Sequence, residues 1–221
     1  MRPLHPHKSN KKEKEVKKKS KNQTNYIATN REIEWLARAI SHDPRSSRLW
    51  NGALAYYDGC AVLVTTDTFR MHMVKLGKCD RPFDAKIVDL KSVLSALREH
   101  KLDHAAFQLD QDVVQLYKQT ISGEMSQARF VERCAQRDVG NPWVSFERAI
   151  PTTNRPVSEF FGMKSKYLTD ALMIACGESV AIHSEDGSSR AIVFRPEGDR
   201  WMAVVMPSPM LLVCKMNGRD A

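Results

Sequence analysis

Three strand-like runs follow one another in residues 49–76, LWNGALAYYDGCAVLVTTDTFRMHMVKL. The first run, Leu49–Tyr57, and the second, Ala61–Thr66, are rich in apolar and β-branched residues, and Asp58-Gly59 between them is typical of a tight hairpin turn. The third run, Arg70–Leu76, contains alternating methionines. The segment therefore predicts three consecutive strands, the first two joined as a hairpin.

An amphipathic helix is expected before these strands. Ile33, Leu36, Ala37 and Ile40 recur at the spacing of one helix face, and Asn30 is a plausible N-cap. We expect the folded part of the chain to begin a few residues earlier, near residue 26.

The order of a strand, a helix and three strands then recurs. The second copy is expected at Lys86–Val88, Asp89–His100, His104–Leu109, Val113–Gln119 and Gln127–Cys134. The third copy is expected at Glu159–Met163, Lys164–Cys176, Val180–Ser184, Ala191–Arg195 and Trp201–Met206. Residues 135–158 contain three proline breakers and are expected to form a loop. The chain thus predicts an α+β fold of about three repeated units.

Composition excludes several classes of protein. The 221 residues are 42% hydrophobic and 27% charged, as in an ordinary globular protein. There is no apolar run long enough for a transmembrane helix and no secretory signal, so we expect a cytoplasmic protein without a membrane partner. The five cysteines form no C-x-x-C pair, which argues against a disulfide framework or a metal site.

Much of the positive charge lies in an N-terminal tail. The formal net charge is +8, and residues 1–25 contain nine basic and two acidic residues. Such a segment buries too little apolar surface to fold, so we expect a disordered basic tail. Its lysines are candidates for contacts with DNA phosphates, namely Lys11, Lys12, Lys17, Lys18 and Lys19. A merely solubilising extension remains the alternative.

Several motifs resemble the bacterial DNA polymerase sliding clamp, the β subunit. They are Asn51–Leu54, Val64–Met71, Phe146–Pro151, Lys166–Leu172 and Val204–Pro207, in the order in which that family carries them. The resemblance extends over nearly all of the expected folded part. It implies a DNA-clamp-like fold that follows the basic tail, with a two-repeat domain at 26–150 and a half domain at 151–221.

The chain departs from that family in the number of repeats. It has three expected units where a clamp subunit has six, and the first clamp domain has no counterpart. We expect a homo-oligomer: four chains would supply the twelve units of a family ring, while a dimer or a monomer that does not encircle DNA remains open.

The resemblance also implies a shallow pocket that docks short peptide motifs. The positions that match its lining are Thr66, Asp67, Thr68, Phe69, Arg70, Met71, Arg148, Ala149, Val204, Met206 and Pro207. Apolar residues such as Met71 and Val204 are also ordinary core residues, and Asp67 is expected to bond backbone groups of a turn. Thr68 stands where the family has glycine, so a positive φ there would be strained.

Two expected helices carry basic pairs outside their apolar faces. Arg31 and Arg38 are seven residues apart on the first helix, and Lys91 and Arg98 are seven apart on the second. These four are candidates for non-specific contacts with double-stranded DNA, as on the inner face of a clamp. A solvated helix face is the alternative.

No enzyme motif is present. The chain lacks a glycine-rich dinucleotide loop, a P-loop and a nucleophile elbow, and the His183–Asp186 segment is interpreted as a polar hairpin. We expect no catalytic residue and no cofactor. The resemblance to the sliding clamp implies a processivity factor that tethers a polymerase and clamp-loader-type or repair proteins to DNA in replication. The alternatives are a non-encircling adaptor or decoy for the same peptides, and a basic-tail DNA-binding protein.

Overall fold

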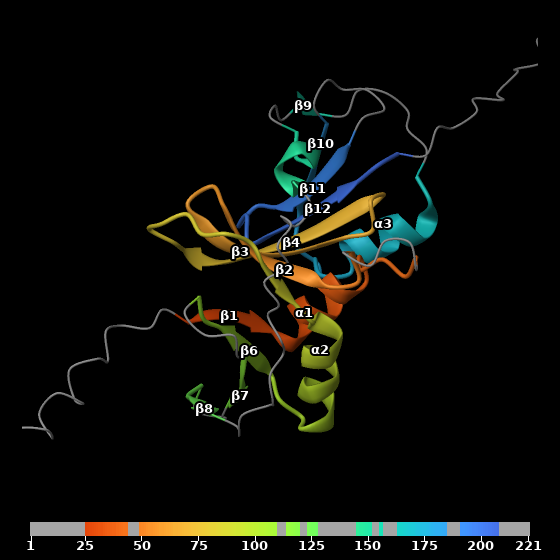
Figure 1. Ribbon diagram of the computed structural model, residues 1–221. Helices are drawn as coiled ribbons and strands as arrows, with labels where there is room; N and C mark the ends of the chain where they lie inside the picture. Colours follow the sequence, from red (N-terminus) through yellow and green to blue (C-terminus); the bar gives the residue numbers. More distant parts are fainter. Residues whose placement is uncertain are drawn as a thin grey trace, which may run out of the picture.

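The computed structural model describes residues 25–43, 49–109, 114–119, 123–127, 145–151, 155–156, 163–184 and 191–207. Within these ranges two sheets carry the α-helices on one side (Figure 1). The basic tail and its five candidate lysines lie outside the described residues. So do most of the expected strands at 127–134 and 159–163.

The described elements confirm the repeated order of the first two units. Unit one comprises β1 (Tyr26–Thr29), α1 (Asn30–Ala37), β2 (Gly52–Tyr57), β3 (Cys60–Thr66) and β4 (Arg70–Lys78). Unit two comprises β5 (Lys86–Val88), α2 (Leu90–Glu99), β6 (His104–Phe107), β7 (Gln115–Gln119) and β8 (Met125–Gln127). Asp58 and Gly59 both have positive φ, as a primed hairpin turn between β2 and β3 requires.

Unit three has the same helix and three strands. It comprises β9 (Arg155–Pro156), α3 (Ser165–Leu172), β10 (Val180–Ser184), β11 (Ile192–Pro196) and β12 (Trp201–Val205). The region expected as one loop, residues 135–158, contains β9 and a short 3-10 helix, η3 (Phe146–Ala149), so that expectation was wrong in part. Pro156 is tolerated in β9 because this strand lies at the edge of the sheet.

The first helix begins one residue earlier than its pattern indicates. Thr29, not Asn30, is the N-cap: its hydroxyl accepts from the backbone N–H of Glu32 at 3.1 Å. The Glu32 carboxylate in turn accepts from the backbone N–H of Thr29 at 2.8 Å. This capping box satisfies two helix-end donors, and it fixes the start of α1 immediately after β1.

Units one and two exchange their first strands. β1 of unit one pairs with β6 of unit two, and β5 of unit two pairs with β2 of unit one, both antiparallel. Helices α1 and α2 lie side by side, joined by a bond of 2.9 Å from Arg98 to Glu34 (Figure 1). Each unit therefore completes the sheet and the helix layer of the other.

Unit three continues the sheet of unit one. β12 pairs with β4 in antiparallel register, Trp201 opposite Val74 and Val205 opposite Arg70, which joins both sets of strands into one eight-stranded sheet. Its order is β5-β2-β3-β4-β12-β11-β10-β9. The expected boundary between two domains at residues 150 and 151 stays a prediction. The eight-stranded sheet contains strands from both sides of that boundary.

Both faces of the eight-stranded sheet are buried at its centre. Leu54, Leu63 and Phe194 lie in the core on the helix side, whereas Val64 and Val193 lie in a second cluster on the opposite face. This explains why β12 is apolar throughout, and β3 over Ala61–Val64, rather than alternating.

A buried histidine lies where α1 meets β4. The His72 ring stacks on Trp35 with centroids 4.2 Å apart, and its Nδ1 lies 2.9 Å from the Trp35 carbonyl oxygen, to which it donates. Burial lowers the pKa of His72 to about 3. The ring is therefore neutral at physiological pH, and protonating it requires opening the core.

His72 predicts a loss of stability in mild acid. Because the unfolded chain binds a proton near pH 6.5 and the folded chain does not, the free energy of unfolding falls as pH drops below that value. At about 1.4 kcal/mol per pH unit, we expect a loss of about 2 kcal/mol between pH 6.5 and 5. Urea unfolding at several pH values measures this loss in the free energy of unfolding. The His72→Gln variant should lose most of this slope, and the exposed-site control His100→Gln should keep it; an unchanged slope in His72→Gln would contradict the assignment.

Candidate functional site

The turn between β3 and β4 is the most constrained segment of the predicted site. The Asp67 carboxylate accepts from the backbone N–H groups of Phe69 and Arg70, each at 3.0 Å. The Thr66 hydroxyl accepts from the backbone N–H of Thr68 at 3.2 Å and donates to the Arg70 carbonyl at 2.7 Å. The expectation that Asp67 bonds backbone groups of a turn is confirmed.

Thr68 is held in a conformation that costs free energy. Its φ is +77°, in the left-handed region that β-branched residues avoid. The hydrogen bonds from its own backbone N–H to Thr66 and from the N–H of Phe69 to Asp67 hold the turn in this shape. The effect is to present Phe69 outward, with 57% of its surface exposed.

Arg70 has a structural role at the base of the turn. It is only 6% exposed, and its guanidinium donates to Asp67 at 2.9 Å, to Asp170 in α3 and to the carbonyl of Arg38 at the end of α1. Its Cζ also lies 4.8 Å from the centre of the Tyr167 ring. One buried cation therefore joins the turn, α1 and α3.

Asp170 remains ionised within this cluster. Burial acts to raise the pKa of its carboxyl, but the hydrogen bonds and charges of Arg70 and Arg38 outweigh burial, and the pKa lies below its usual value. Arg38 donates to Asp170 at 3.1 Å. A buried carboxylate with two guanidinium partners is satisfied, so it holds α3 against the turn.

The end of β12 meets the same turn. The backbone N–H of Met206 donates to the Phe69 carbonyl at 2.7 Å, and Met206 is 43% exposed. Pro207 follows it and is half-buried. Two exposed apolar side chains, Phe69 and Met206, thus belong to adjacent backbone segments that the sequence separates by more than a hundred residues.

A hollow of about 390 Å³ opens beside the turn. It is lined by Ile40, Ser41, His42, Asp43, Asp67, Thr68, Phe69, Arg70, Lys164, Lys166 and Tyr167. The Lys164 ammonium lies 5.8 Å from the centre of the Phe69 ring and 5.4 Å from that of Tyr167. We call this the turn hollow. Its wall combines aromatic surface with positive charge.

The predicted pocket residues are only partly brought together. Thr66–Arg70 form the turn, and Met206 lies beside it. Met71 and Val204 are paired in the sheet and are buried on its opposite face. There they share a cluster with Phe146 and Ile150. Arg148 and Ala149 are exposed on η3 and line none of the described hollows. Their role in peptide docking stays a prediction.

Sequence reasoning missed the remaining wall of the turn hollow. Residues 40–43 follow α1, and Lys164, Lys166 and Tyr167 belong to the start of α3. From the sequence, Lys164 and Lys166 could be described only as basic residues near the start of a helix. No local signal places them beside a turn a hundred residues away.

The predicted DNA-binding side chains lie on the helices, and most are paired. Arg31 donates to the carbonyls of Met173 and Ile174, Arg38 to Asp170, and Arg98 to Glu34. Lys91 is exposed on α2.

Arg38 and Arg98 line a second hollow of about 310 Å³, which we call the helix hollow. Its wall also includes Leu94, Lys166 and Asp170. The helix hollow therefore brings α1, α2 and α3 to one surface, with cations from each.

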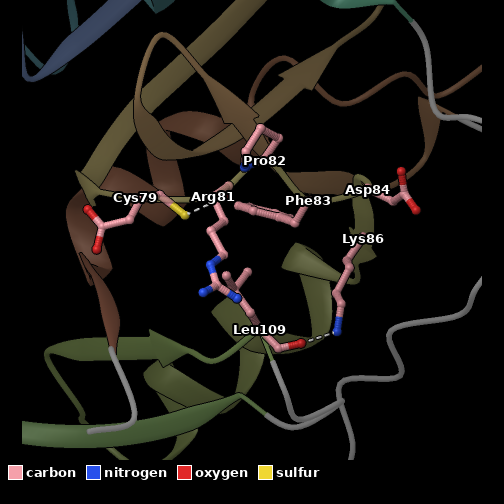
Figure 2. A pocket seen from close by; sticks show the side chains of 8 residues that line it. Cys79, Arg81, Pro82, Phe83, Asp84, Lys86 and Leu109 are labelled. Carbon is pink, nitrogen blue, oxygen red and sulfur yellow. Dashed lines mark hydrogen bonds between the residues drawn. The ribbon is translucent and has the colours of Figure 1, made fainter.

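A third hollow, of about 490 Å³, lies between β4 and β5. Figure 2 shows the 79–84 loop around it, with the Cys79 thiol donating to the Arg81 carbonyl at 3.2 Å and Lys86 donating to the Leu109 carbonyl. Burial and a hydrogen bond with Cys79 raise the pKa of the neighbouring Tyr26 to about 12. These contacts fix the position of the 79–84 loop.

No metal cluster is found in the described ranges. No group of three or more histidine, cysteine or acidic side chains there could hold a metal ion. His183 and Ser184 are consecutive in β10 and so point to opposite faces of the sheet. None of the described helices is long and apolar enough to span a membrane.

The chain is similar to solved structures of bacterial clamps. The Pseudomonas aeruginosa DNA polymerase sliding clamp matches at 15% identity and a TM-score of 0.53, over 85% of this chain and 68% of that one. The Bacillus subtilis clamp matches at 13% identity and a TM-score of 0.54, over 92% of this chain and 67% of that one. The Caulobacter crescentus β clamp matches at 12% identity and a TM-score of 0.55, over 84% of this chain and 65% of that one.

This chain has the sliding-clamp fold. It spans about two thirds of the length of those clamps. No protein-family model and no curated protein matches the sequence. The expected clamp-like α+β architecture is therefore confirmed by structure, at identities too low for sequence matching.

The strain at Thr68 gives a prediction of stability. Replacing Thr68 by glycine removes a left-handed penalty of about 1–2 kcal/mol and adds a smaller backbone entropy cost of about 0.5–1 kcal/mol. We expect the free energy of unfolding of Thr68→Gly to rise by up to about 1 kcal/mol, measured by urea unfolding. The matched change Ser95→Gly, on the exposed side of α2, should instead lower it by a similar amount. A lower free energy of unfolding in both variants would contradict the conclusion that Thr68 is strained.

Proposed function

We propose that this chain is a sliding-clamp-like processivity factor, which docks short peptide motifs of a polymerase or other replication and repair proteins and keeps them on DNA. The observation that carries the proposal is the turn hollow, formed where unit one and unit three share a sheet. The clamp fold supports the same role. The proposal involves no catalysis and no cofactor, and the protein would act in the cytoplasm.

The turn hollow suits an extended peptide with one large apolar side chain. Phe69 in its wall provides exposed apolar surface. Met206 does not line the hollow but is exposed on the segment bonded to Phe69, and a methionine adapts to side chains of different shape. Lys164 and Lys166 provide positive charge for an acidic group of the peptide. Because Arg70 is already bonded to Asp67 and Asp170, it supports the wall rather than binding the ligand.

Contact with double-stranded DNA would be non-specific. The candidates are Arg31, Arg38, Lys91 and Arg98 on the helices and the lysines of the tail. Phosphate contacts need only positive potential and no reading of bases. A clamp-loader-type protein would open or place the assembly through the same turn hollow.

One observation favours a second candidate function. Arg38 and Arg98 are paired with the carboxylates of Asp170 and Glu34, which reduces the positive charge that the helices offer to DNA. Arg31 keeps its charge, but its guanidinium is held by two backbone carbonyls. A non-encircling adaptor or decoy would need only the turn hollow. A basic-tail DNA-binding protein would need only the lysines before residue 25.

Peptide docking predicts a loss of binding when the hollow is altered. Met206→Asp and Phe69→Ala should each weaken binding of a labelled clamp-motif peptide at least tenfold, because they remove apolar contact worth about 1.4 kcal/mol or more. Fluorescence anisotropy measures the dissociation constant. Met206→Leu keeps the apolar contact and should bind like the unaltered chain. Equal binding by all four proteins would contradict docking at this site.

Topological tethering predicts a difference between circular and linear DNA. A clamp loaded on a nicked circle should elute with the DNA in gel filtration and should be lost when the circle is cut. A decoy should bind the peptide but never elute with DNA. A chain that lacks residues 1–25 separates the third candidate: loss of all DNA binding, with a steep salt dependence in the full chain, would assign DNA contact to the tail alone.

A further inference from the structure

Two lysines of the turn hollow have no acidic partner among the described residues. Lys164 and Lys166 are both exposed in its wall, and neither forms an ion pair within that part of the chain. Asp170, four residues after Lys166, is already bonded to Arg70 and Arg38. The described wall therefore leaves positive charge on this side of the hollow.

The acidic residues of the wall do not balance this charge. The wall contains three basic residues, Arg70, Lys164 and Lys166, and two acidic residues, Asp43 and Asp67. The Asp67 carboxylate is paired with the Arg70 guanidinium at 2.9 Å and also accepts from two backbone N–H groups of the turn. The two lysines therefore share the wall with one further carboxylate, that of Asp43, and positive charge is in excess.

Lys164 differs from Lys166 in how it is held. Its ammonium lies 5.8 Å from the centre of the Phe69 ring and 5.4 Å from that of Tyr167, within the range of cation–π attraction. Lys166 also lines the helix hollow, whereas Lys164 lines the turn hollow alone among the three hollows described above. An ammonium already held beside the rings loses less conformational freedom when it pairs with a ligand.

We propose that Lys164 selects peptides that carry an acidic side chain two residues from their large apolar side chain. The inference rests on the proposed peptide docking and names the chemistry of the docked segment. In an extended chain, residues two apart point to the same side and are separated by about 6.5 Å. The distance of 5.8 Å from the ammonium to the Phe69 ring is close to this spacing. An apolar side chain on Phe69 therefore brings such a carboxylate to Lys164.

The surroundings of the ammonium favour a peptide over the phosphates of DNA. Phe69 is 57% exposed, and its ring is a large apolar surface directly beside the charge. A phosphate satisfies the charge but brings no apolar side chain to cover the ring. A peptide with one apolar and one acidic side chain satisfies both, so it gains free energy from burial as well as from the ion pair.

Binding of labelled clamp-motif peptides to the full chain, measured by fluorescence anisotropy, tests this selection. One set of peptides has aspartate, asparagine or lysine two positions before the large apolar residue, and a second set has them two positions after it. In one of the sets we expect aspartate to bind about threefold more tightly than asparagine and about tenfold more tightly than lysine, as for ion pairs at a protein surface. Added salt should reduce the difference.

Variants at Lys164 should change this preference while the chain stays folded. Lys164→Glu should invert the order, so that the lysine peptide binds more tightly than the aspartate peptide. Lys164→Arg keeps the charge and the attraction to the rings, so it should keep the preference for aspartate. Lys118→Glu, at an exposed residue of β7 in the other sheet, changes the net charge by the same amount and should leave the order unchanged. Circular dichroism checks that each variant is folded.

The outcomes separate this proposal from peptide docking itself. If the aspartate, asparagine and lysine peptides bind equally in both sets and Met206→Asp still weakens their binding, docking stands and selection by Lys164 is overturned. If none of the peptides binds, both proposals fail. If Lys164→Glu leaves the order of the peptides unchanged but lowers retention of the chain on circular DNA, the ammonium contacts phosphates and the proposal is overturned.

Discussion

The antiparallel pairing of β4 with β12 is the contact on which the rest of the structure depends. It joins strands that are more than a hundred residues apart and places Met71 opposite Val204 and Arg70 opposite Val205. Without it, no strand of unit three pairs with the sheet of unit one. With it, the turn after β3, the end of β12 and the start of α3 meet at one place, and the turn hollow exists only there.

The buried ionic cluster beside this pairing fixes its position along the strands. Arg70 follows the turn, and its guanidinium reaches both Asp170 in α3 and the Arg38 carbonyl after α1. A slip of one residue in this pairing would turn the side chains of β12 to the opposite faces of the sheet and shift unit three along β4. The Asp170 carboxylate would then be left with one fewer partner in the interior. The cluster therefore specifies a single arrangement and keeps Phe69 and Met206 at the surface.

The repeated units could be predicted from sequence because their signals are local. Helical spacing around Leu36, the Asp58-Gly59 turn and the apolar runs of β3 and β12 each lie within a few residues. The exchange of β1 and β5 could not be predicted, since pairing partners leave no mark in a single sequence. For the same reason the wall of the turn hollow at residues 40–43 and Tyr167 was missed, and Met71 and Val204 could not be separated from core residues, which they are. The Thr29 cap was missed because Asn30 is an equally good capping residue by type.

The central claim is that units one and three form one cooperative sheet. Native-state hydrogen exchange, followed by NMR over a series of low denaturant concentrations, tests it at single amides. The account predicts that the amides of Met71 and Met73 in β4 and of Met202 and Val204 in β12 exchange with one free energy and one denaturant dependence, that of global unfolding. Exchange of the β12 amides through an opening that leaves β3 and β4 protected would contradict it.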